Sequence, residues 1–245
     1  MFIFSRNKKV VVDAYTRHED IRTSYPIETS AKFLPEWWVK APSSITLDGY
    51  VPSPTLKTCS GLTDLYTKGL ILPLWTDIAI KVESNKSYSW RCADETSSIS
   101  VHAEHQWDMF ADPTKYGHLK IACEWAVSTK ENIDWVLMAP YWNTTLSEPY
   151  SIPPGIVNGF YKPVPLQTQL MLDISTPTSF MLTAGTPLVQ IIPLTEKRID
   201  LRRHVVSEEE FYKLTNYRKA KFIHRHKHNI KMQSETNKPK CPFTF

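Results

Sequence analysis

The stretch from residue 152 to residue 193 decides the fold. It opens with Ile152-Pro153-Pro154-Gly155-Ile156-Val157-Asn158-Gly159-Phe160-Tyr161 and closes with Ala184-Gly185-Thr186-Pro187-Leu188-Val189-Gln190-Ile191-Ile192-Pro193. Proline and glycine at both ends predict tight turns. The apolar segments at 166–174, 180–182 and 188–192 lie between such turns and predict strands. The stretch therefore predicts a mainly β architecture.

The rest of the chain extends this pattern. Strands are predicted within 8–15, at 70–75 and at 77–83, where Ile78, Ile80 and Val82 alternate with other residues. The segments 88–91 and 99–102 are expected to form one hairpin, and 118–125 and 135–138 another pair. Residues 39–56, with three prolines, look like a loop.

Two helices are predicted. The first lies near 60–68, where Leu62, Leu65 and Tyr66 share one helical face and Gly69 suits the C-terminal cap. The second lies near 207–222, because Ser207 followed three residues later by Glu210 forms a capping box.

Length and composition suggest how the chain is divided. The 245 residues contain 18 prolines and only 7 glycines, which favours many short strands with stiff connections. We expect an aromatic N-terminal segment, 1–57, that packs on a β-clip or sandwich-like core at 58–195. Its Trp37 and Trp38 are expected in core or intersubunit packing. A basic helix and tail, 196–245, follows.

Charge, cysteine use and hydropathy limit the kinds of protein and partner that fit this sequence. Thirteen Lys and Arg against five Asp and Glu give residues 197–245 a net charge of +8, and sixteen against twenty leave −4 on the remainder. Such a basic extension is typical of contacts with nucleic acid or an acidic partner. The four cysteines are dispersed, which favours reduced structural thiols. No apolar run is long enough to span a bilayer, so no membrane partner is expected.

Five short motifs in the same order resemble a family of tailed-phage proteins, including proteins of phages that infect marine cyanobacteria, known as a domain of unknown function. The motifs are Leu34-Pro35-Glu36-Trp37-Trp38, Cys59-Ser60-Gly61-Leu62, residues 69–77, Pro154-Gly155-Ile156-Val157-Asn158 and residues 185–193. The resemblance implies a phage origin, with the protein in the host cytoplasm during infection or in the virion. It implies no activity.

Residues 135–194 also resemble, more distantly, the β-clip fold of trimeric dUTPases and dCTP deaminases. The segments 134–140, 154–161 and 184–192 stand where that family has its motifs. The resemblance implies a pocket that includes Asn158, Tyr161 and Gln190. Asn158 replaces the aspartate that orients water in the family, and a neutral amide is no general base. The glycine-rich C-terminal motif is also missing, so the sequence favours loss of that chemistry.

The segment 102–108 is the densest group of potential metal ligands. On a strand, His102 shares a face with Glu104 and Gln106; on a helix, His105 and Asp108 converge. His118 follows closely enough to add a ligand across a hairpin. Two histidines and a carboxylate can hold Fe(II), which makes an iron-dependent oxygenase one hypothesis. Histidines that only form hydrogen bonds are the alternative.

Three functional hypotheses result. The first is a non-enzymatic phage protein, either a virion component or an accessory binding module, that forms homo-oligomers or binds other virion proteins. The second is a dUTPase-like nucleotide-binding or nucleotide-processing protein, and the third is the oxygenase. A nucleotide or Fe(II) is expected only under these last two. The basic run His224, Arg225, His226, Lys227 and His228 is a candidate contact for nucleic acid or an acidic partner, or a solvated tail.

Overall fold

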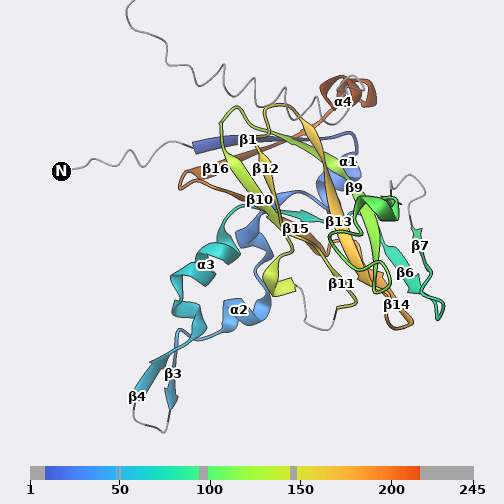
Figure 1. Ribbon diagram of the computed structural model, residues 1–245. Coiled ribbons are helices and arrows are strands. Elements are labelled where there is room, and N and C mark those ends of the chain that lie inside the picture. Colours follow the sequence, from blue (N-terminus) through green and yellow to red (C-terminus); the bar gives the residue numbers. More distant parts are fainter. Residues whose placement is uncertain (1–8, 48, 50, 94–98, 144–147, 216–245) are drawn as a thin grey trace, which may run out of the picture.

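Strands from almost the whole length of the chain form three larger sheets and one separate hairpin (Figure 1). The computed structural model describes residues 9–47, 49, 51–93, 99–143 and 148–215. The protein is mainly β, as predicted, with several sheets packed in a sandwich-like arrangement. None of the helices in this described part is both long and apolar enough to cross a bilayer.

The largest sheet carries the strand order β11-β13-β9-β1-β16, and β8 also pairs with β9. Its strands are β1 (Lys9–Thr16), β8 (Ile99–Ser100), β9 (Tyr116–Ser128), β11 (Tyr150–Ser151), β13 (Val164–Asp173) and β16 (Arg198–Val205). β9 and β13 are long antiparallel neighbours, and Met171 lies opposite His118 in their register. This register positions the candidate site described below.

Two further sheets complete the body. One has the order β12-β10-β15-β5-β2 and comprises β12 (Gly155–Asn158), β10 (Asp134–Met138), β15 (Pro187–Pro193), β5 (Leu70–Pro73) and β2 (Glu28–Thr29). The other has the order β14-β6-β7 and comprises β14 (Thr178–Leu182), β6 (Ile78–Val82) and β7 (Tyr88–Cys92). A single cluster of buried apolar side chains draws on all three larger sheets. The three sheets therefore share one hydrophobic core.

Helices are short and lie around the sheets. They are α1 (Glu19–Ser24), α2 (Glu36–Lys40), α3 (Ser60–Thr67) and α4 (Glu208–Thr215), with 3-10 turns η1 (Ser30–Phe33), η2 (Leu56–Thr58), η3 (Glu104–Gln106) and η4 (Tyr141–Asn143). The helix predicted near 60–68 is present as α3, and the helix predicted near 207–222 is present as α4 as far as Thr215; residues 216–222 lie outside the described residues. Gly69 follows α3 with φ +89°, as a C-terminal glycine should, and the Ser207 hydroxyl accepts the Glu210 N–H at 3.2 Å.

Two predicted strand pairings are wrong. β7 pairs with β6 while β8 pairs with β9, so 88–91 and 99–102 do not form one hairpin. β9 pairs with β13, β1 and β8, whereas β10 pairs with β12 and β15. Periodicity identifies strands but does not choose their partners, and sequence neighbours are only the commonest choice.

The predicted boundaries of the β core are also wrong. β1 and β16 pair in parallel from Lys9 with Arg198 to Thr16 with Val205, inside the largest sheet. Val10 and Val12 of β1 are fully buried in the core. Among the described residues, the core therefore extends at least from β1, which starts at residue 9, to β16, which ends at residue 205, and these two strands are neighbours in space.

The segment 39–56, expected as a loop, contains a hairpin of β3 (Ser44–Leu47) and β4 (Val51–Pro54). This hairpin and its flanking residues 41–56, here called the arm, project away from the sheets beyond α2 and α3 (Figure 1). At its base, Trp38 is 5% exposed and lies against Tyr66, with ring centroids 4.5 Å apart. Of the tryptophan pair, Trp38 packs as expected, but Trp37 is 56% exposed.

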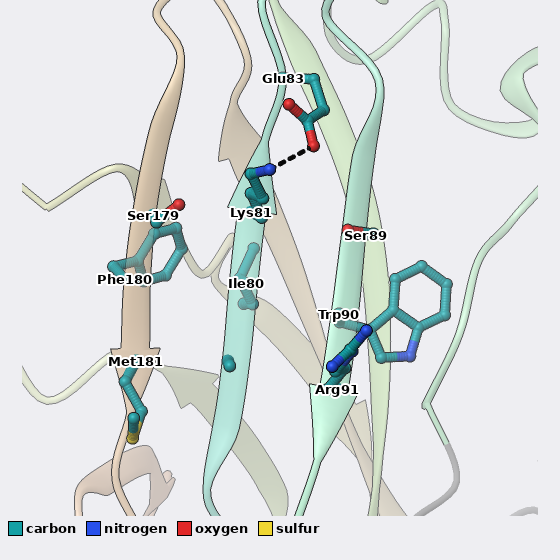
Figure 2. A pocket seen from close by; sticks show the side chains of 10 residues that line it. Ile80, Lys81, Glu83, Ser89, Trp90, Arg91, Ser179, Phe180 and Met181 are labelled. Carbon is teal, nitrogen blue, oxygen red and sulfur yellow. Dashed lines mark ion pairs between the residues drawn. The ribbon is translucent and has the colours of Figure 1, made fainter.

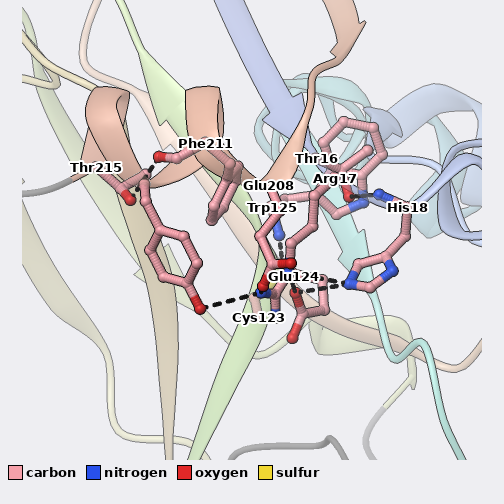
Figure 3. Close-up of polar contacts among 10 residues, drawn as sticks. Thr16, Arg17, His18, Cys123, Glu124, Trp125, Glu208, Phe211 and Thr215 are labelled. Carbon is pink, nitrogen blue, oxygen red and sulfur yellow. Dashed lines mark hydrogen bonds and ion pairs between the residues drawn. The ribbon is translucent and has the colours of Figure 1, made fainter.

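A charged network fastens α4 to the largest sheet (Figure 3). The Arg17 guanidinium lies 3.3 Å from the Glu124 carboxylate of β9 and 3.1 Å from the Glu208 carboxylate of α4. It also donates to the Tyr212 hydroxyl at 3.3 Å and lies over the Phe211 ring. Glu124 is almost fully buried, so Arg17 supplies the opposite charge that its burial requires.

Candidate functional site

The pocket with the richest chemistry lies between the segment 102–110 and the outer face of the largest sheet. It encloses about 590 Å³, within the usual size range of small-molecule sites. Its lining comprises His102, Gln106, Trp107, Phe110, His118, Pro153, Gln169 and Met171. Three of these side chains are apolar, and five carry hydrogen-bonding groups, including the indole N–H of Trp107.

The two long strands supply the floor of the pocket. Alternation directs Leu119 and Leu170 into the core, and it places His118, Gln169 and Met171 on the opposite face. Although His118 lies on this outer face, it is only 4% exposed, because the segment 102–110 covers it. The pocket is thus built outside the hydrophobic core, where ligand groups do not compete with core packing.

A contact from the three-stranded sheet holds the His118 backbone. The Tyr88 hydroxyl of β7 contacts both the N–H and the carbonyl oxygen of His118 at 3.2 Å. Gly117 makes this possible, because a Cβ at that position would lie 2.5 Å from the Tyr88 ring. The floor of the site is therefore fixed from two sheets.

Backbone donors determine which nitrogen of His118 carries the proton. The His102 backbone N–H donates to His118 Nδ1 at 3.3 Å, so Nδ1 must be the acceptor nitrogen. The proton of the neutral ring is then on Nε2, which lies 2.7 Å from Gln169 Oε1 and donates to it. With its oxygen engaged, Gln169 offers its amide N–H groups as donors.

A backbone donor likewise determines the direction of the hydrogen bond between His102 and Gln106. The Ala103 backbone N–H donates to Gln106 Oε1 at 3.0 Å, which identifies that atom as the oxygen. His102 Nδ1 lies 3.1 Å from the same oxygen and must donate to it. The neutral His102 ring therefore keeps its Nε2 lone pair, and Gln106 keeps its amide N–H groups. None of these remaining groups has a partner among the described residues.

The other wall of the pocket is apolar and aromatic. Trp107 lies near-parallel to the His118 ring at an interplanar angle of 27°, with centroids 6.2 Å apart. The His102 and His118 rings are 5.0 Å apart. Phe110 is 68% exposed at the rim of the pocket. Flat, aromatic surroundings favour a flat ligand.

Burial lowers the pKa of the His118 imidazole, and the nearby His102 and Lys120 lower it further, although the Gln169 hydrogen bond opposes this. The unfolded chain then takes up the proton first, near its ordinary pKa of about 6.5. The stability that neutral His118 contributes is complete above about pH 6.5 and is lost as the pH falls below that value.

We therefore expect the free energy of unfolding to fall between about pH 6.5 and about pH 5.5 more steeply in the wild type than in His118→Asn. The asparagine keeps an acceptor for the His102 N–H but does not titrate. Urea unfolding of both proteins across this range measures the difference. Parallel loss of stability in the two proteins would contradict the assignment.

A second hollow, of about 670 Å³, lies on the outer face of the β14-β6-β7 sheet (Figure 2). Lys81 is at its centre and forms an ion pair with Glu83 at 2.8 Å, while Arg91 lies on the adjacent strand. It is an open sheet surface whose central cation is already neutralised. The residues that line it include no buried polar side chain, so it offers less for recognition than the His118 pocket.

The three pocket residues suggested by the β-clip resemblance do not converge. Asn158 donates to the Asp134 carboxylate at 3.1 Å, and the Tyr161 hydroxyl contacts Asn132, both at the exposed end of β12. Asp134 and Met138 are at opposite ends of β10, and Gln190 pairs with Met138. At about 3.4 Å per residue, the two places are more than 10 Å apart.

Gln190 instead terminates α3. Its side chain is fully buried, and its amide group donates to the carbonyl oxygens of Leu65 at 2.6 Å and Lys68 at 2.9 Å. It also lies 3.4 Å from the Ser30 hydroxyl. These carbonyls belong to the last turn of the helix, which has no intrahelical donor for them. The role of Gln190 in this position is structural.

The proposed metal ligands His102, His105 and Asp108 do not come together in one site either. β8 ends at Ser100, and only one 3-10 turn, η3, follows, so neither the strand nor the helix geometry applies. His102 lines the pocket beside His118, but His105 and Asp108 do not. Within the described residues, no three His, Cys, Asp or Glu side chains are grouped to hold a metal ion. The predicted contacts at 224–228 lie outside the described residues.

The segment selected from the sequence contributes part of this pocket's lining, but most of the other lining residues were not predicted. Gln169, Met171 and Pro153 come from a region that was interpreted only as strand and turn. One signal was available: Gln167 and Gln169 alternate with apolar residues in β13, so each must face away from the core. Their proximity to His118 depends on the pairing of β9 with β13.

Comparisons with known proteins add nothing to what the geometry of the pocket indicates. No protein-family model matches the chain, and no match is found among curated proteins.

Proposed function

We propose that this chain is an accessory binding module whose pocket recognises a small flat ring that carries a carbonyl–NH–carbonyl edge. The observation that supports this most directly is the donor and acceptor pattern of the pocket. Gln106 and Gln169 each offer amide N–H donors, and the neutral His102 ring offers an acceptor. An imide edge is the complement of two donors and one acceptor.

The apolar wall supports a ring as the ligand. Trp107, Phe110 and Met171 provide the contact area, and the imidazole rings add further flat surface. Uracil-type pyrimidines combine a flat ring with an imide edge, so they are the natural first probes. This proposal keeps the nucleotide hypothesis as a binding function but moves the base from Asn158, Tyr161 and Gln190 to the His118 pocket. A phage origin and a virion role stay predictions.

Uridine is expected to bind the full-length protein and to raise its melting temperature. Cytidine should bind about tenfold more weakly or worse, because its edge places an acceptor and a donor against the wrong groups, at about 1–3 kcal/mol for each unpaired polar group. 3-Methyluridine, which lacks the N–H, should also bind weakly. Isothermal titration of the three nucleosides measures this order, and equal affinities would refute the edge recognition.

The substitution Gln106→Glu tests ligand recognition without disturbing the fold. The glutamate keeps an oxygen for the Ala103 N–H but replaces the amide donors with a second acceptor, so uridine binding should fall at least tenfold. Gln167→Glu, at an exposed position of β13 outside the pocket lining, is the matched control and should bind as the wild type does. An unchanged affinity in Gln106→Glu would overturn the proposed function.

A further inference from the structure

The arm exposes a concentration of apolar side chains that nothing in the described chain covers. Ile45, Val51 and Leu56 of the arm, and Val39 in α2 just before it, are between 45% and 74% exposed, within eighteen residues of sequence. A two-stranded hairpin is at best marginally stable in water without a third strand or a packed face. The other described residues of the hairpin are also exposed or half-buried, so no core supports it. The surface of another protein molecule would cover these side chains and stabilise the hairpin.

The prolines of β4 determine which edge of the hairpin is open. Ser44 pairs with Pro54 and Thr46 pairs with Pro52, and the Thr55 N–H donates to the Ser43 carbonyl at 3.0 Å. Hydrogen-bonded and non-bonded pairs alternate in an antiparallel ladder, and proline has no N–H. The proline pairs are therefore the non-bonded ones, whose backbone groups point outward.

The two edges consequently differ. The outer edge of β4 has no N–H at 52 or 54, which blocks strand addition there. The outer edge of β3 presents the N–H and C=O of both Ser44 and Thr46. Natural edge strands are often protected by charges, but residues 41–47 and 51–56 contain no Asp, Glu, Lys or Arg. The β3 edge is thus open and unprotected.

We propose that the β3 edge pairs with the β3 edge of a second copy of this chain, forming a continuous sheet in the order β4-β3-β3-β4 around a twofold axis. The edge is complementary to itself. With the axis at Ile45, Ser44 of each copy exchanges two backbone hydrogen bonds with Thr46 of the other. All four outward groups on each edge are then satisfied, and the two Ile45 side chains meet.

Charge favours the second copy over other partners. An uncharged apolar edge offers no attraction to nucleic acid or to an acidic peptide, whereas its best complement is another uncharged edge. The pairing is small compared with the roughly 1,000 Å² of a stable interface, so the dimer is expected to be reversible and to depend on concentration. This inference is independent of the His118 pocket, which lies on another sheet.

Sedimentation velocity of the full chain over a concentration series tests the pairing. The wild type should shift from monomer to dimer. Ile45→Lys and Ile45→Glu should each weaken the dimer about tenfold or more, because like charges then face each other across the axis. An equimolar mixture of the two variants should restore dimerisation, because opposite charges meet. Ile45 is exposed, so melting temperatures of the monomers should stay close to that of the wild type.

Two further variants keep the test independent of any one substitution. Thr46→Pro removes an outward N–H without touching the β3-β4 ladder and should abolish the dimer. Leu56→Lys makes an equal apolar-to-charged change outside the paired edge and should leave it intact. A wild type that is monomeric throughout, a dimer that survives Ile45→Lys and Thr46→Pro, or a mixture that stays monomeric would each overturn the proposal.

Discussion

Gly69→Ala is expected to destabilise the protein by about 2–5 kcal/mol, a large part of a typical folding free energy of about 5–15 kcal/mol. Gly69 has φ +89°, which costs an L-residue about 1–2 kcal/mol. Its added Cβ would also lie 2.2 Å from the Ile191 carbonyl oxygen and 3.0 Å from the backbone of Ile192. Backbone cannot rotate away as a side chain can, so β5 must separate from β15.

The measurement is thermal and urea unfolding of the variant beside the wild type. For a chain of this length, the expected change corresponds to a melting temperature lower by roughly 4–20 °C. Gly61→Ala is the matched control, because Gly61 lies in α3 with nothing within 4 Å of a new Cβ. That variant should be neutral or more stable by up to about 1 kcal/mol. Equal stability of the two variants would contradict the packing of β5 against β15.

Gln190→Glu is expected to cost at least about 3 kcal/mol near neutral pH, because the fully buried site keeps the carboxyl protonated while the unfolded chain gains free energy by ionising it. The amide holds both the Leu65 and the Lys68 carbonyl oxygens, whereas the single O–H of a protonated carboxyl can donate to only one of them. The carboxyl would hold its proton in the folded state, whereas the unfolded chain ionises near its ordinary pKa of about 4.3. The variant should therefore lose stability as the pH rises above that value.

This second substitution also separates two roles for Gln190. A structural role predicts loss of stability without any loss of nucleoside contact beyond what unfolding explains. If Gln190 lined a nucleotide pocket instead, the variant would keep its melting temperature and lose ligand affinity. Gln167→Glu makes the same chemical change on an exposed face of β13 and should alter the free energy of unfolding by less than about 0.5 kcal/mol.

Sequence reasoning reached the candidate site only in part, and the reason is geometric. The segment 102–108 was selected for its polar density, but its chemistry was assigned to metal binding on regular secondary structure. A single 3-10 turn places His102, Gln106 and Trp107 in one pocket and directs His105 and Asp108 elsewhere. Turns of this kind carry no periodicity from which the directions of side chains can be predicted.

The pocket residues suggested by the resemblance to dUTPases were assigned wrongly for a different reason. Gln190 lies in an apolar strand after a turn, the pattern that made it a pocket candidate, yet the strand runs behind α3. The same glutamine serves a ligand or a helix end, depending on what the sheet packs against. A motif that is compatible with two roles does not choose between them.

Local interactions, which the sequence alone determines, account for the mainly β class and for the strands β1, β5 to β10 and β13 to β15. They also account for the caps at Gly69 and Ser207. Alternation, turn residues and capping act over a few residues, so the sequence contains all of the information that they need. The parallel pairing of β1 with β16, the β9-β13 register and the pocket around His118 were decided only by the tertiary structure. Each joins residues far apart in the sequence, where the choice of partner depends on the packing of the whole core.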